Sequence, residues 1–119
     1  MLDETTTVQQ LREHVEKFID EREWLQFHNP KDLSMALSVE ASELMEKFLW
    51  IDSKKSFQEI ENSREEIEQE LSDVLTLVIC FARIAKIDIS GALARKLEHN
   101  TKKYPVDKAK GRFTKWNKL

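Results

Sequence analysis

Two pairs of acidic residues share one spacing in the middle of the chain. Glu40 and Glu43 form the first pair, and Glu70 and Asp73 form the second, each with two residues between its members. On a helix, residues three positions apart are neighbours on one face. Carboxylate oxygens are the ligands that hard divalent cations such as Mg²⁺ or Mn²⁺ prefer. The two pairs therefore predict a cation site if the helices that carry them lie side by side.

The orientation of the pairs favours this interpretation. At about 100° per residue, Glu40 and Glu70 each fall inside the apolar arc of their helix, while Glu43 and Asp73 fall at the borders. A carboxylate that points at a core is costly unless it is paired or metal-bound. The open alternative is that all four are solvated surface carboxylates. The other acidic residues nearby are better explained as solvated faces or helix-capping groups: Glu46, Glu65, Glu66 and Glu68. Glu46 follows Glu43 by three positions, so an outer metal ligand is the lower-ranked alternative for it.

The donor set excludes two other kinds of metal site. No acidic residue stands three positions before any of the three histidines, so the Glu-x-x-His pattern of di-iron bundles is absent. Zinc sites need a group of Cys and His ligands. Cys80 is the only cysteine, and its place in an apolar run predicts a core residue.

Aromatic residues flank the first acidic pair. Trp24 and His28 lie in a short connection before it, and Trp50 follows it. Aromatic side chains in connections commonly close a core, but beside a metal site they also offer a flat surface on which a nucleotide base stacks.

A polar stripe lies near the C-terminus. Lys96, Asn100 and Lys103 share one helix face and Tyr104 follows them. Two ammonium groups and an amide on one face suit phosphate oxygens. A solvated helix end is the alternative, since lysines also favour the negative end of the helix dipole.

The elements that must position these residues are helices. With two glycines and two prolines in 119 residues, long helices are expected and a fold of many strands is not. Apolar periodicity predicts an all-α four-helix bundle. Its helices are expected at about 5–22, 32–51 (with Asp32 as N-cap), 63–86 and 89–103.

Composition limits the remaining choices. The predicted organisation is one helical domain over residues 1–106 and a basic, extended tail over 107–119. Residues 1–95 carry 11 basic and 20 acidic groups, whereas residues 96–119 carry 8 basic and 2 acidic groups, so the net charges are −9 and +6. A basic segment suits a polyanion. The polar, acidic N-terminus is unlike a signal peptide, and no apolar run has the roughly 18 residues of a membrane span, so a cytoplasmic protein with no membrane partner is expected.

Taken together, these motifs resemble the MazG-like all-α nucleoside triphosphate pyrophosphohydrolases, in their dCTP pyrophosphatase branch. The resemblance covers about residues 8–106 and depends on three stretches. They are Glu21–Pro30 ahead of the first acidic pair, Glu70–Leu75 around the second, and the closing pattern Lys96-x-x-x-Asn100-x-x-Lys103-Tyr104-Pro105.

The resemblance implies Mg²⁺-dependent hydrolysis of a nucleoside triphosphate, dCTP or a related pyrimidine dNTP, to the monophosphate and pyrophosphate, with Mn²⁺ as a substitute ion. It implies a tight homodimer or a dimer of dimers. It assigns metal binding to Glu40, Glu43, Glu70 and Asp73, and we expect Glu40 or Glu43 to orient the attacking water. It also places Trp24, His28 and Trp50 at the base and sugar, and Lys96, Asn100, Lys103 and Tyr104 at the triphosphate.

Two departures leave the preferred base open. Leu77 and Val15 stand where the mammalian enzymes of the branch carry Tyr and His near the nucleotide. Other functions also stay open at this point. One is a non-catalytic helical module that binds a nucleotide or a protein and has a structural metal. Another is a nucleic-acid binder that uses the basic tail, which the acidic body disfavours.

Overall fold

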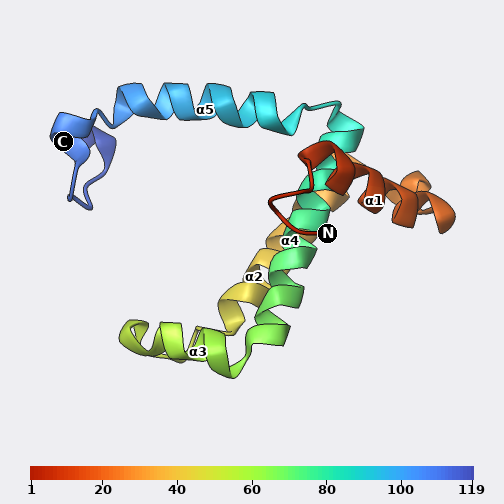
Figure 1. The fold of residues 1–119 in the computed structure, drawn as a ribbon, viewed down its shortest axis with the longest axis horizontal. Coiled ribbons are helices and arrows are strands. Elements are labelled where there is room, and N and C mark those ends of the chain that lie inside the picture. The colour runs from red at the N-terminus through yellow and green to blue at the C-terminus, as the bar shows by residue number, and fades with distance from the viewer. The chain divides into compact units, whose positions relative to one another are not determined.

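The computed structural model describes residues 1–119, and the fold is all-α, as predicted. The long helices are α1 (Val8–Glu21), α2 (Pro30–Glu46), α4 (Arg64–Ala85) and α5 (Ile89–Lys103) (Figure 1). Short elements complete the chain: α3 (Ser56–Asn62), α6 (Val106–Ala109), and 3₁₀ turns at Trp24–Phe27, Ser53–Lys55 and Trp116–Lys118. No helix is both long and apolar enough to cross a membrane.

The chain divides into two compact units, Met1–Lys86 and Ile87–Leu119. In the first unit, α2 packs along α4 over much of its length, and α1 packs on α4 (Figure 1). The second unit contains α5, α6 and the last 3₁₀ turn. The predicted organisation, a domain over residues 1–106 and a tail over 107–119, stays a prediction.

The start of α2 differs from the expectation. Asn29, and not Asp32, is the N-cap: its Oδ1 accepts a hydrogen bond from the Asp32 N–H at 2.9 Å. Pro30 occupies the first helical position, where its missing N–H costs nothing because that group has no partner inside the helix. α2 also ends at Glu46 and not at Ile51, and turns follow it.

The C-terminal segment is another difference. The sequence predicted an extended tail, but Val106–Ala109 forms one helical turn after Pro105. This turn is held by backbone bonds such as that from the Ala109 N–H to the Pro105 carbonyl at 2.9 Å. Pro105 is the N-cap of this turn, with an extended backbone that precedes the first helical residue.

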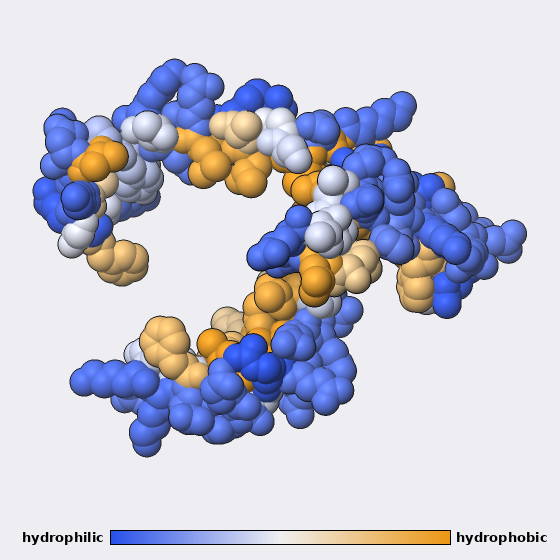
Figure 2. Space-filling view, viewed as in Figure 1, coloured by the Kyte–Doolittle hydropathy of each residue, from blue (hydrophilic) through white to orange (hydrophobic).

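The hydrophobic core is small and lies near the C-terminal half of α4. Ile19, Leu33 and Cys80 are buried together, with Leu77 and Phe81 among the partly buried residues around them. By contrast, α2 and the turn after it leave a row of apolar side chains exposed: Met35, Val39, Met45 and Leu49. Figure 2 shows apolar side chains over the α2–α4 part of this unit.

Candidate metal centre and nucleotide pocket

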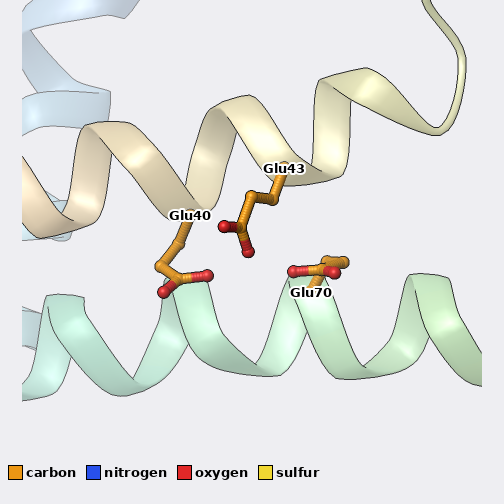
Figure 3. A group of neighbouring side chains, drawn as sticks. All are labelled: Glu40, Glu43 and Glu70. Atoms are coloured by element: carbon orange, nitrogen blue, oxygen red, sulfur yellow. The ribbon is translucent and has the colours of Figure 1, made fainter.

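Three of the four predicted carboxylates converge between α2 and α4. Glu40 and Glu43 project from α2 toward α4, and Glu70 projects from α4 toward them (Figure 3). Each offers one oxygen atom, and these oxygens lie within 4.8 Å of one another. Because both helices present one face to each other, the spacing of three residues places Glu40 and Glu43 on successive turns beside Glu70. We call these three residues the carboxylate cluster.

The carboxylate cluster has unbalanced negative charge. A hydrogen bond from Glu43 to Glu40 and the negative charge of Glu40 raise the pKa of Glu43 above its usual value of 4.5. The pKa of Glu70 is also raised. Burial is the largest cause, and the hydrogen bond and negative charge of Glu43 come next. In both cases the charged form is disfavoured because other carboxylates stand close by or because water is excluded.

One oxygen of the cluster has no partner. Oε2 of Glu40 is buried and makes no hydrogen bond. A buried carboxylate oxygen ordinarily finds a donor or a cation. The all-oxygen donor set, the mutual repulsion and this unpartnered atom together fit a hard divalent cation.

Asp73 does not join the cluster. It lies on the next turn of α4, three residues beyond Glu70, and it is exposed. It lines a pocket together with Glu40 of the carboxylate cluster. The predicted role of Asp73 as a fourth metal ligand stays a prediction.

An aromatic pocket of about 290 Å³ adjoins the carboxylate cluster. Trp24 and His28 reach it from the connection between α1 and α2, and the ring of Trp24 meets the ring of Phe18 edge to face at 5.8 Å. The pocket is lined by Phe18, Ile19, Trp24, His28, Ala36, Glu40, Asp73, Thr76, Leu77 and Cys80. Its apolar walls and few polar atoms are typical of a small-molecule site.

His28 supplies an unused polar atom in this pocket. Its Nδ1 is buried and has no hydrogen-bond partner. Burial is the main cause of a lowered pKa, and the positive charge of Arg83 adds to it. The ring is therefore neutral at pH 7, and the nitrogen is available to a ligand.

Trp50 lies apart from the aromatic pocket, whereas Leu77 and Val15 lie at it or next to it. Trp50 lies in the turn after α2, where it is 92% exposed, and it does not line the aromatic pocket. Leu77 lines the aromatic pocket, and Val15 lines a neighbouring pocket of about 300 Å³ that shares Phe18, Asp73 and Thr76 with it. The two departures from the dCTP pyrophosphatase branch therefore stand at these pockets.

The polar stripe lies in the second unit. Lys96, Asn100 and Lys103 are carried by α5, and Tyr104 caps its C-terminal end. The ammonium of Lys103 stands over the ring of Trp116 at 4.9 Å. Tyr104 lines a pocket of about 470 Å³ with Arg112, Phe113, Thr114 and Lys115. Trp116 was not predicted as a site residue, although an aromatic residue within a basic segment was a usable signal.

A second omission lies close to the carboxylate cluster. Glu66 is not a free solvated carboxylate, because its Oε2 binds Nζ of Lys47 at 2.7 Å. Lys47 follows Glu43 by four positions and Glu66 precedes Glu70 by four. That symmetric spacing could have indicated the ion pair.

Comparison with known proteins gives the family and the fold of this chain. Residues 35–119 match the MazG-like family. The chain is 32% identical over 115 residues to dCTP pyrophosphatase 1 of Bos taurus and to that of Homo sapiens, covering 95% of this chain and 68% of each relative. Its fold is similar to the crystal structure of a pyrophosphatase from Archaeoglobus fulgidus, with a TM-score of 0.80 and 34% identity over 88% of this chain and 98% of that chain.

The all-α fold and the comparisons define a nucleoside triphosphate pyrophosphohydrolase. The chain belongs to the MazG-like family, and within it to the dCTP pyrophosphatase branch.

Proposed function

We propose that this enzyme hydrolyses dCTP or a related pyrimidine deoxynucleoside triphosphate to the monophosphate and pyrophosphate, in a Mg²⁺-dependent reaction that clears unwanted nucleotides from the pool. The observation that carries the proposal is the carboxylate cluster with its unpartnered Glu40 oxygen beside an aromatic pocket. The names of the relatives indicate the nucleotide.

Glu40, Glu43 and Glu70 would hold the metal, with Asp73 at the edge of the pocket as a fourth ligand. Oxygen ligands suit Mg²⁺, and Mn²⁺ would substitute for it. When bound, the ion supplies positive charge that polarises the phosphates and offsets the charge that develops in the transition state.

The side chains perform the remaining work. Glu40 or Glu43 orients a water for attack, which breaks the bond between the α- and β-phosphates, and a raised pKa suits Glu43 to accept its proton. Trp24 stacks on the base and His28 Nδ1 bonds to base or sugar. Trp50 is proposed to contact the base or sugar as well. Lys96, Asn100, Lys103 and Tyr104 are proposed to contact the triphosphate.

A homodimer or homotetramer forms part of the same proposal. Met35, Val39 and Met45 of α2 and Leu49 of the turn after it are exposed and line a groove of about 650 Å³. The buried core of a single chain is small, and exposed apolar surface of this kind marks an interface. A second copy is the occupant we propose, in a cytoplasmic enzyme with no membrane or nucleic-acid partner.

A substrate panel tests the function. The eight common NTPs and dNTPs are incubated with the enzyme and Mg²⁺, and pyrophosphate and monophosphate are measured by ion-exchange chromatography. We expect equal amounts of both products, fastest with dCTP or another pyrimidine dNTP, and no turnover after EDTA. Nucleotide binding without turnover, or release of inorganic phosphate, would contradict the proposal.

A further inference from the structure

The Lys47–Glu66 ion pair stands one helical turn from the carboxylate cluster. Lys47 lies four residues beyond Glu43 on α2, and Glu66 lies four residues before Glu70 on α4. Residues four apart share one helix face. α2 and α4 run in opposite directions. Glu43 therefore faces Glu70 across the two helices, and one turn further along Lys47 faces Glu66.

These two cross-helix pairs have opposite effects on the distance between the helices. Glu43 and Glu70 each place a carboxylate oxygen within 4.8 Å of the other, so in their charged forms and without a cation they push α2 away from α4. Lys47 and Glu66 are opposite charges with Nζ and Oε2 only 2.7 Å apart, so they draw the helices together. The ion pair therefore opposes the repulsion at the adjacent turn.

The Lys47–Glu66 ion pair lies at the C-terminal end of α2. Lys47 is the C-cap of α2, and the chain continues into turns at 47–50. Helix ends fray because their last carbonyls have no partner inside the helix. The Lys47 side chain is 27% exposed and that of Glu66 is 66% exposed, so the lysine half of the pair is partly shielded from solvent while the carboxylate half is open to it.

We propose that Lys47 is a positioning residue for the metal site. Through Glu66, it holds the end of α2 at the spacing from α4 at which Glu43 and Glu70 bind one divalent cation. This inference rests on the proposed metal role of the carboxylate cluster.

The sign of one mutation separates positioning from simple electrostatics. Lys47 carries a positive charge near a cation site, so charge alone predicts that Lys47→Met tightens cation binding. Positioning predicts the reverse. Glu66→Gln removes the pair while leaving the Lys47 charge, and positioning predicts that it weakens binding as well.

The test measures Mn²⁺ dissociation constants of the full chain by electron paramagnetic resonance, without nucleotide. We expect Lys47→Met and Glu66→Gln each to weaken Mn²⁺ binding about tenfold, the scale of lost groups that support metal ligands. Lys47→Arg should restore binding close to wild type. The matched control is Lys17→Met, which breaks the exposed ion pair of Lys17 with Glu21 on α1 and should leave binding unchanged.

Equal or tighter Mn²⁺ binding by Lys47→Met would overturn the inference. If the wild-type chain itself fails to bind Mn²⁺, the proposed metal site fails, which is a separate outcome. If circular dichroism shows that Lys47→Met is unfolded, the charge-swapped double variant Lys47→Glu with Glu66→Lys is measured instead. Binding stronger than that of Glu66→Gln alone supports positioning, and binding no stronger overturns it.

A second readout is the metal dependence of turnover. We expect Lys47→Met to raise the Mn²⁺ concentration for half-maximal activity while kcat at saturating metal and KM for the nucleotide stay unchanged. A fall in kcat that saturating metal does not recover would contradict a role limited to placing the ligands.

Discussion

The two ends of α4 use charged residues in opposite ways. Near its start, Glu70 faces two further carboxylates, Glu40 and Glu43 of α2. Near its end, Arg83 donates two hydrogen bonds to Asp20 of α1, at 2.8 and 3.0 Å. Buried apolar side chains surround the second end and not the first.

The difference separates a binding site from a structural contact. The Arg83–Asp20 pair is satisfied within the chain, and it lowers the pKa of Asp20. The carboxylate cluster is unsatisfied within the chain, which costs stability unless a ligand arrives. A group of like charges that the fold holds together without a partner is the better indicator of function.

The largest expected effect comes from neutralising the cluster. Glu43→Gln should lower kcat on the order of 10²-fold or more, the range lost with a general base. The same change should raise the melting temperature of the metal-free protein, because one repelling charge disappears. Steady-state kinetics in saturating Mg²⁺ and thermal melts in EDTA measure the two effects.

Glu65→Gln is the control for that variant, since it removes the same charge from the exposed first turn of α4. Activity should be unchanged. Turnover of Glu43→Gln near that of the wild type would remove Glu43 from the reaction.

A core substitution near the C-terminal end of α4 should lower the stability of the fold and leave metal binding unchanged. Ile79 is 2% exposed, so Ile79→Ala leaves a cavity. The expected loss is about 2–5 kcal/mol of unfolding free energy, measured by urea denaturation. Mn²⁺ affinity of the folded variant should match the wild type. A large loss of affinity in the folded variant would show that the two ends of α4 are not independent.

The smallest effect is a difference in pH dependence. The pKa values of Glu43 and Glu70 are raised above 4.5 in the fold, so their charged forms destabilise the metal-free protein at neutral pH. That cost is relieved as pH falls through the raised values. The pKa of Asp20 is lowered from 3.8, so its stabilisation is present above 3.8 and is lost as pH falls through the lower folded value.

Thermal melts in EDTA between neutral and acidic pH measure both trends. Glu43→Gln should flatten the gain in stability on mild acidification. Asp20→Asn should flatten the loss at stronger acidity. If the metal-free wild type loses stability steadily from pH 7 downward, the carboxylate cluster does not carry the strain described here.

Much of the fold was readable from periodicity, because apolar residues repeating every three to four positions bury one helix face wherever the helix packs. The second long helix was misplaced at both ends. Asp32 was predicted as the N-cap, whereas Asn29 is the N-cap and Pro30 occupies the first helical position, which proline favours. At the other end, local pattern extended the helix to Ile51, but the chain turns at 47–50 to reach α3.

The sequence predicted which helices would bring carboxylates together, but not which of the four carboxylates would form the group. Spacing indicated that Glu40, Glu43 and Glu70 would share a space between two helices, and they do. The same spacing applied to Asp73, which the structure places outside the three-carboxylate group. The ion pair of Lys47 with Glu66 escaped prediction because it joins residues 19 positions apart.

The sequence by itself determined the all-α class and the carboxylate pairs, since helical period and residue type are local properties. Only the tertiary structure decided how the faces of α2 and α4 meet. That meeting leaves Glu40 Oε2 without a partner, and it pairs Lys47 with Glu66 beside it. The physical reason is that register between two packed helices depends on contacts between distant residues, which no single helix specifies.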